Sequence, residues 1–486
     1  MTIEELQREN AAQKTKIDAL EQQLSQLLKL IRGFKSERLA PSISTSEQPT
    51  LFDVAASSKP QETIKEAISY TRSKKKHQGR NALPEHLPVK EIIIEPEQDV
   101  TGLTKIGEEI TETLEYTPAS LVKRRTIRPK YAKAKGEGII IGQLPSRPIE
   151  KSIAEASLLA HILVNKYVDH LPLYRQIQMF KRDFGWNASQ STFCDWVSSC
   201  CTLLEPLYNT LKQKIISSNY IQADESPIKV LDKDKIGSTH QGYQWVYHSP
   251  LHKLVLFNYR KGRGQAGPKE ILEHYQGYLQ CDGYKVYDKF GAQDNITLVG
   301  CLVHARRKFF DAQDNDPKRA KQALNIFAKI YAKDKQIKEH AAQDLILKQE
   351  LRLKHIAPLI KDIKSWIEQE SLKVLPKSAI GKAMTYYLKQ YHKLEAVTLD
   401  PRLELDNNLI ENAIRPLALG RKNYLFAGSH KAAQNTAMLY SFFGSCKVNN
   451  VNPRQWLQYT LENINDWNIQ NLEKMLPTNF SKNIDS

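Results

Sequence analysis

The stretch 219-NYIQADESPIKVL-231 decides the expected fold, because the chain changes there from a helical to a β-rich pattern. Further strand-like runs follow at 242–248, 253–259, 277–284 and 296–304, and a helix is expected after Pro268. The resulting order is strand, strand, strand, helix, strand, helix, strand. It predicts an α/β core of the ribonuclease H-like type: a mixed five-stranded sheet with flanking helices, antiparallel hairpins first and crossover helices later.

Two of these runs share a local pattern, Ile221-Gln222-Ala223-Asp224 and Leu279-Gln280-Cys281-Asp282. Because side chains alternate along a strand, each run places an apolar and a small residue on one face and Gln and Asp on the other. A single strand-ending Asp is more often a turn former, as the following Pro227 and Gly283 would favour. Together, the two runs predict carboxylates at the ends of neighbouring strands.

A third acid stands in 407-NNLIENAIRPLALGRKNYLFAGS-429, which is otherwise basic. A helix begun at 407 or 408 has an apolar stripe at 409, 410, 413, 414 and 417, and places Glu411 and Arg415 on the opposite side. Pro416 is expected to kink or end this helix. Taken alone, Glu411 and Arg415 read as a surface ion pair worth about 0.3–0.5 kcal/mol.

Three carboxylates from two strands and a late helix suit a site for two Mg²⁺ ions, for which Mn²⁺ is expected to substitute. Two such ions about 4 Å apart can activate a water or hydroxyl and stabilise the leaving oxygen of a phosphodiester displacement. The chain carries 70 Lys and Arg against 54 acids, a net charge of +16, which favours a polyanionic partner. Basic and aromatic neighbours of the acids could hold a nucleic-acid strand: Arg306, Arg307, Lys308, Arg415, Arg421, Lys422, Tyr424 and Phe426.

Ile3, Leu6, Asn10, Gln13, Ile17, Leu20, Leu24, Leu27 and Ile31 follow each other by steps of three and four. This heptad spacing predicts a coiled coil and at least a dimer; the alternative is a helix folded onto its own domain. A linker composition follows to about Gln78. The run 121-LVKRRTIRPKYAKAK-135 offers seven cations to phosphates, or is a solvated tether. Its candidate DNA contacts are Lys123, Arg124, Arg125, Arg128 and Lys130.

Between 152 and 214 the pattern is helical, with a turn at Gly185 and a helix capped near Ser189. This arrangement resembles a helix-turn-helix, although any helical hairpin with a glycine turn would look similar. The second helix is expected to place one apolar face inward, made of Phe193, Trp196, Val197 and Cys200.

The six cysteines include no C-x-x-C pair, so a reducing compartment is expected and a four-cysteine zinc site is not. Cys301 and His304 are spaced C-x-x-H, but two ligands do not make a zinc site, and a buried thiol with a helix-capping histidine is the favoured interpretation. The acidic start MTIEELQREN indicates no signal peptide, and no apolar run approaches the roughly 20 residues of a membrane helix.

The stretches QADESPIKVL, LQCDGYKVY, CLVHARRKFF and, above all, NNLIENAIRPLALGRKNYLFAGS resemble the catalytic (large) transposase subunit of the insertion sequence 66 family. The likeness extends to GRNALPEHLP, LEYTPASLVKRRTIRPKYA and SFFGSCKVNNVNPRQWL. It implies a DD(E) transposase with Asp224, Asp282 and Glu411 as catalytic metal ligands, and a helical insertion before the glutamate helix. It further implies binding of terminal inverted repeats and target DNA, accessory proteins of the same element, and a cytoplasmic, nucleoid-associated location.

One departure from the family is clear. Members usually carry C-x-x-C motifs on both sides of the LEYTPA segment, whereas DVTGLTKIGEE and YAKAKGEG contain no cysteine. Structural zinc is therefore not expected, and recognition of DNA ends is expected to depend on the basic run. Two alternatives stay open: a catalytically inactive DNA-binding or regulatory derivative, and a ribonuclease H-like nuclease that only hydrolyses.

Seven regions are expected along the chain. They are an oligomerisation helix at 1–40, a basic linker with a degenerate zinc-finger-like DNA-binding region at 41–150, a helix-turn-helix-like region at 151–216, the first part of the core at 217–308, the helical insertion at 309–395, the second part of the core at 396–450, and a helical tail at 451–486.

Overall fold

The computed structural model describes residues 146–232 and 238–480, with scattered positions before them. By its contacts the chain forms two units, residues 36–123 and the rest, and of the smaller unit only 121 and 122 are described. Among the earlier positions, the backbone of β1 (Lys130–Ala132) pairs antiparallel with that of β2 (Ile139–Ile141). The following description therefore concerns the larger unit.

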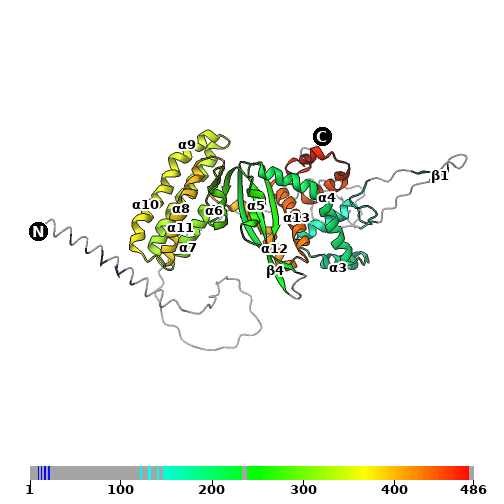
Figure 1. The fold of residues 1–486 in the computed structure, drawn as a ribbon, viewed down its shortest axis with the longest axis horizontal. Coiled ribbons are helices and arrows are strands. Elements are labelled where there is room, and N and C mark those ends of the chain that lie inside the picture. Colours follow the sequence, from blue (N-terminus) through cyan, green and yellow to red (C-terminus); the bar gives the residue numbers. More distant parts are fainter. Residues whose placement is uncertain are drawn as a thin grey trace, which may run out of the picture. The chain divides into compact units, whose positions relative to one another are not determined.

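A mixed five-stranded sheet forms its centre, with the strand order β5-β4-β3-β6-β7. The strands β3 (Tyr220–Leu231), β4 (Thr239–Ser249) and β5 (Leu254–Arg260) are antiparallel neighbours. β6 (Gly277–Gln280) and β7 (Ile296–Val299) run parallel to β3. The predicted mixed sheet with flanking helices is confirmed, and its order is consistent with a ribonuclease H-like core (Figure 1).

The parallel strands are joined by helices, as crossover connections require. α5 (Ala266–Leu272) precedes β6, α6 (Lys285–Gly291) leads to β7, and α7 (Leu302–Asp311) follows it. Alternation along β3 divides the interior between the two faces of the sheet: Ile221 and Ala223 pack into one apolar core, whereas Tyr220 packs into another. Both faces of the sheet are thus covered by helices.

The first core contains the helices that precede the sheet, α2 (Ala156–Tyr167), α3 (Leu173–Phe184) and α4 (Gln190–Ile216). Gly185 ends α3 with a φ of 66°, and the Ser189 hydroxyl accepts a bond from the Thr192 amide at 3.0 Å at the start of α4. These are the predicted turn and cap, and all four residues predicted for the inner face are buried. Since α4 packs along the sheet in the same core, the boundary expected after 216 does not separate two cores.

The helix α13 (His430–Val448) covers β5, which is an edge strand of the sheet. Ser441 and Ser445 accept hydrogen bonds from the β5 amides of Phe257 and Val255, at 2.7 and 2.9 Å. These bonds satisfy donors that an edge strand would otherwise leave free for pairing with another chain. α14 (Pro453–Asn463) and short 3₁₀ turns complete this side of the molecule.

The second core is formed by α7 and by the helices that fill the interval expected for the insertion. These are α8 (Pro317–Ala341), α9 (Leu345–His355), α10 (Ala357–Glu370) and α11 (Ala379–Glu395), with 3₁₀ turns at Ser371–Lys373 and Ala396–Thr398. They pack against the face of the sheet opposite to α4 and α13 (Figure 1). A segment at 399–407 leads from them to α12 (Asn408–Tyr424).

Most of the predicted coiled coil, the linker and the basic side chains of 123–130 lie outside the described residues. Of the predicted seam, Gln13, Ile17, Leu20 and Leu24 are described; all four are helical and exposed, and the three apolar ones are more than half exposed. All six cysteines carry free thiols, five of them buried. Among the described helices, none has the length and apolar character needed to cross a membrane.

Candidate active site

Asp224 lies on β3, two residues beyond the end of the parallel pairing with β6. The last paired positions are Gln222 and Gln280, so the predicted adjacency of the two Gln-x-Asp runs is confirmed. The prediction that Asp224 ends its strand is wrong, because β3 continues through Pro227 to Leu231 against β4. Pro227 is tolerated because it lies beyond the pairing with β6, where β3 has a partner on one side only.

Asp282 follows the last residues of β6, and it does form the turn that its neighbours suggested. Its Oδ1 accepts a hydrogen bond from the Tyr284 amide at 2.9 Å, which starts the turn into α6. The other carboxylate oxygen has no such local partner. Asp224 is held similarly, since its Oδ1 accepts from the Glu225 amide at 2.8 Å. Each aspartate is therefore oriented by one backbone bond.

Glu411 lies in the first turn of α12, where a negative charge is stabilised by the helix dipole. The predicted stripe is buried at Ile410, Ala413, Ile414 and Leu417, whereas Leu409 is 42% exposed. Pro416 was predicted to kink or end the helix; it does not end it, because α12 continues for two further turns, held by packing of its apolar stripe. Among the described ion pairs, the partner of Glu411 is His304 at 3.9 Å and not Arg415.

The three acids act on each other electrostatically. Burial and, to a smaller extent, the charges of Glu225, Asp282 and Glu411 together raise the pKa of Asp224 to about 7, against one backbone hydrogen bond that lowers it. Among the described residues, no group of three or more His, Cys, Asp or Glu side chains has an arrangement that could hold a metal ion. The acids thus lie near one another as an open, mutually repelling group.

Glu225 is a charged neighbour of Asp224 that sequence reasoning missed. Its side chain is 3% exposed and lies on the face of β3 opposite to Asp224. Arg263 donates to its Oε1 at 2.6 and 2.9 Å, and the Tyr287 hydroxyl donates to Oε2 at 3.1 Å. The Arg263 guanidinium also stacks on Tyr284, 4.3 Å from the ring centroid. The available signal was alternation, which assigns Glu225 to the buried face with Ile221 and Ala223 and so requires a partner.

Cys301 and His304 have separate roles. The Cys301 thiol is buried, accepts a hydrogen bond from the Asn407 amide at 3.3 Å, and has its pKa raised by burial to about 12, so it stays protonated. His304 lies in the first turn of α7 and faces Glu411, with a buried Nδ1 that has no hydrogen-bond partner. The expected buried thiol is confirmed, whereas the histidine contacts an acid instead of capping the helix.

Comparison with known proteins matches residues 151–435 to the model of the Transposase IS66 family, a span that contains the whole sheet and all three acids. Two curated relatives from Sinorhizobium fredii, the uncharacterized proteins y4qI and y4jD, are each 30% identical. The alignments cover 94% and 95% of this chain, and 88% and 94% of the relatives. This chain belongs to the IS66 transposase family.

Other parts of the chain match the same family. Residues 441–478, which include α14, match the IS66 C-terminal element. Residues 19–92 match the model described as Transposase C of IS166 homeodomain, and this span overlaps the predicted coiled coil and linker. The recognition made from the short sequence motifs is thereby confirmed.

The cations expected to contact DNA differ in their surroundings in this IS66 family member. Arg306 and Arg307 on α7, and Arg415 and Lys422 on α12, are exposed. Arg421 instead donates to the Ser226 hydroxyl and the Pro227 carbonyl of β3, at 2.9 and 2.5 Å. Tyr424 is partly buried against Tyr440, whereas the nearby Phe426 is 40% exposed.

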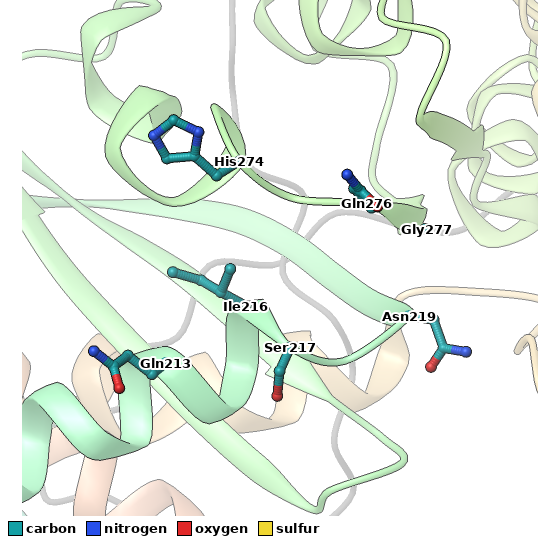
Figure 2. Close-up of a pocket in the computed structure, with 7 residues that line it drawn as sticks. All are labelled: Gln213, Ile216, Ser217, Asn219, His274, Gln276 and Gly277. Atoms are coloured by element: carbon teal, nitrogen blue, oxygen red, sulfur yellow. The ribbon is translucent and has the colours of Figure 1, made fainter.

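Figure 2 shows a hollow at the other end of the central strands, where α4 ends and β6 begins. Its lining includes Ser217, Asn219 and Gly277 and no carboxylate. Since a strand rises about 3.3 Å per residue, Gly277 lies on the order of 15 Å from Asp282. This hollow is therefore separate from the group of acids.

Asp224→Asn should stabilise the metal-free protein. A raised pKa means that the folded state binds the proton more tightly than the unfolded state, so ionisation of Asp224 costs stability above about pH 7. The cost fades as pH falls from about 7 towards 4. We expect the variant to be more stable by about 2–4 kcal/mol at pH 8, and by much less at pH 5.

Thermal unfolding in EDTA at the two pH values measures this difference, with the exposed Asp466→Asn as control. A variant that is less stable than the wild type at pH 8 would show that the carboxylate is favourably paired in the fold.

Proposed function

We propose that this protein is a DD(E) transposase that cuts DNA at the ends of an insertion sequence and joins the freed 3′-hydroxyls to target DNA. The observation that supports this most is that two acids far along the chain, Asp282 and Glu411, lie within electrostatic range of Asp224. Asp224 and Asp282 come from neighbouring parallel strands, and Glu411, 129 positions after Asp282, comes close enough to raise the pKa of Asp224. Membership of the IS66 transposase family supports the same activity.

The donor chemistry of this group fits divalent cations. Its three side chains offer only carboxylate oxygens, the ligands that Mg²⁺ and Mn²⁺ prefer. Asp224, Asp282 and Glu411 would hold two ions, and their mutual repulsion is what a bound cation would relieve. Bound there, the ions would activate the attacking water or hydroxyl and stabilise the leaving oxygen. Zinc is not part of the proposal, because the chain has no C-x-x-C pair, and Cys301 with His304 would supply only two ligands.

The chain's own cations would position the DNA over the acids. Arg306, Arg307, Arg415 and Lys422 are exposed on the two helices that carry His304 and Glu411, and can contact phosphates. Arg421 is engaged with β3, so we assign it the support of the strand that bears Asp224. The basic run that begins at Lys123 would add contacts to terminal and target DNA, and we propose an association with the nucleoid on this ground.

A strand-joining assay tests the proposal. The full chain is incubated with DNA carrying the terminal repeats, a target plasmid and Mg²⁺ or Mn²⁺. We expect metal-dependent nicks at the element ends and covalent joining to the target. Nicks without joining would identify a nuclease that only hydrolyses, and binding without either product would identify an inactive DNA-binding derivative.

Joining two ends requires at least two protein copies, and the exposed Ile17, Leu20 and Leu24 could supply their contact. Removal of residues 1–32 should therefore convert the oligomer to a monomer in sedimentation experiments, with removal of 481–486 as the control. If sedimentation gives the same number of chains per particle before and after the truncation, this helix does not hold the copies together.

A further inference from the structure

Gln222 and Gln280, the residues repeated two positions before the two aspartates, are fully buried. They face each other across the β3–β6 pair, and the Gln222 amide donates to Gln280 Oε1 at 2.9 Å. The Tyr220 hydroxyl donates to the same oxygen at 2.5 Å. Burying such amides is costly unless they are hydrogen-bonded. Their remaining hydrogen-bond partners therefore show which part of the chain the two glutamines bind.

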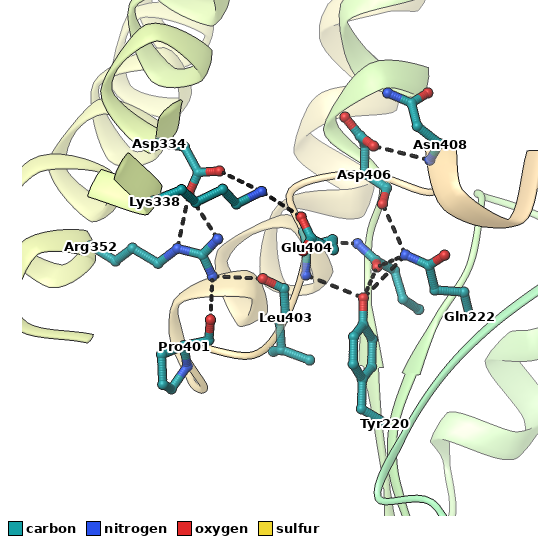
Figure 3. A network of polar contacts seen from close by, with 11 residues as sticks. Tyr220, Gln222, Asp334, Lys338, Arg352, Pro401, Leu403, Glu404, Asp406 and Asn408 are labelled. Atoms are coloured by element: carbon teal, nitrogen blue, oxygen red, sulfur yellow. Dashed lines mark hydrogen bonds and ion pairs between the residues drawn. The ribbon is translucent and has the colours of Figure 1, made fainter. Parts of the chain in front are cut away.

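These partners belong to the segment that leads into α12 (Figure 3). Gln222 donates to the Asp406 carbonyl at 3.1 Å, and Gln280 donates to the Glu404 carbonyl at 2.7 Å. The Tyr220 hydroxyl accepts from the Glu404 amide at 3.2 Å. Three side chains at the centre of the sheet thus bind the backbone a few residues before Glu411.

Gln222 also caps α12. The first amides of a helix need acceptors, and the side chain of the N-cap residue usually supplies one at the second or third position. In α12 the N-cap residue Asn407 makes no such bond, and the Ile410 amide donates instead to Gln222 Oε1 at 3.2 Å. The residue after Ile410 is Glu411, the third acid. This bond therefore attaches the first turn of α12, which contains Glu411, to β3, which contains Asp224.

The insertion holds the same segment from the other side (Figure 3). Arg352 of α9 is fully buried and donates to the Leu403 carbonyl at 2.6 Å and to Asp334 of α8 at 2.7 and 2.9 Å. Lys338 of α8 pairs with Glu404 at 2.5 Å. The segment before α12 is therefore held between the sheet and the insertion.

We infer that Gln222 and Gln280 are positioning residues, a glutamine clasp that sets Glu411 at its working distance from Asp224 and Asp282. The inference rests on the proposed function for its consequence, metal binding by the three acids. It explains why each aspartate has a glutamine two positions before it. Residues two apart lie on the same face of a strand, so the glutamine reaches the backbone that leads into α12 while the aspartate lies at the group of acids.

The test compares Gln222→Leu and Gln280→Leu with Gln244→Leu. Gln244 is a buried glutamine on β4 whose amide donates to the Ala433 carbonyl of α13, at 3.0 Å, and not to α12 or the segment before it. Mn²⁺ affinity is measured by electron paramagnetic resonance, and protection of the first amides of α12 by hydrogen exchange. We expect the two clasp variants to bind Mn²⁺ about 10-fold or more weakly and to lose protection at Ile410. Gln244→Leu should lower the melting temperature but change neither readout.

Wild-type Mn²⁺ affinity in both clasp variants, with Ile410 still protected, would overturn the clasp. An equal loss of Mn²⁺ affinity in Gln244→Leu would also overturn it, because removing any buried glutamine amide would then weaken the site. Failure of the proposed function is distinguishable: the wild type would bind no Mn²⁺, while the exchange experiment would still decide whether the clasp holds α12. If the leucine variants do not fold, Tyr220→Phe removes a single hydroxyl from the clasp and should reduce affinity and protection in the same direction, and unchanged values would contradict it.

Discussion

Replacing Glu411 with glutamine should reduce cleavage of terminal DNA by about 10³-fold or more, with the fold intact. The amide keeps the size of the side chain but removes the charge that would bind the cations, which are worth several kcal/mol in the transition state. Since each 1.4 kcal/mol is about tenfold in rate, such a loss of activity follows. The measurement is the initial rate of nicking with Mg²⁺, with equal melting temperatures as the condition for comparison.

Glu462→Gln is the matched control, because this exposed helical residue of α14 is bonded only to Gln458 one turn away. It should cleave at the wild-type rate. If Glu411→Gln cleaves at the full rate, Glu411 is not a catalytic residue. Glu411 would then be interpreted as a surface acid that forms an ion pair.

Arg352→Met should destabilise the protein by roughly 3 kcal/mol, the largest loss expected from a single change in the insertion. Removing one partner of a buried ion pair leaves the other charge without compensation. Here the change removes the guanidinium that donates to Asp334, which is 4% exposed, and to the Leu403 carbonyl. Lys338 remains 3.1 Å from Asp334, so we place the loss at the lower end of the usual range.

Urea unfolding of the full chain measures this loss. Arg182→Met, which breaks an exposed pair with Asp183 on α3, should change stability little. The double variant Arg352→Met with Asp334→Leu should recover part of the loss, since it no longer buries a lone charge. Equal stability of Arg352→Met and the wild type would show that the insertion does not hold the segment before α12 through this residue.

The sheet could be predicted because its signals are local. Alternation at 220–224 and 278–282 fixed which residues face each core, and the chain order of hairpins and crossover helices fixed the arrangement of the strands. The turn at Gly185 and the cap at Ser189 were equally local, since each depends on one residue type at one position.

Features that depend on long-range contacts could not be predicted. Pro416 was expected to break α12, but the packing of its apolar stripe outweighs one lost hydrogen bond. Likewise, Arg421 resembled a free DNA-binding cation, yet its partner Pro227 lies 194 positions earlier. Gln222 and Gln280 could be recognised in the sequence as a repeated residue. Their hydrogen bonds to the segment before α12 are seen only in the structure.

The candidate site stands between these cases. The strand pattern placed the two Gln-x-Asp runs on neighbouring strands, and the register of β3 and β6 pairs their glutamines. Glu411 stood out as an acid in an otherwise basic stretch, but its assignment to the two aspartates needed the resemblance to a known family, since no local pattern relates it to a residue 129 positions away. The buried pair of Glu225 with Arg263 was missed, because sequence alone does not say which cation meets a buried acid.

The central claim is that Asp224, Asp282 and Glu411 together bind divalent ions. Anomalous scattering from Mn²⁺ in crystals of the full chain tests it most directly. The account predicts two neighbouring manganese peaks, with carboxylate oxygens of all three residues among their ligands. Peaks bound only elsewhere, or peaks at the aspartates that leave Glu411 turned towards His304, would contradict it.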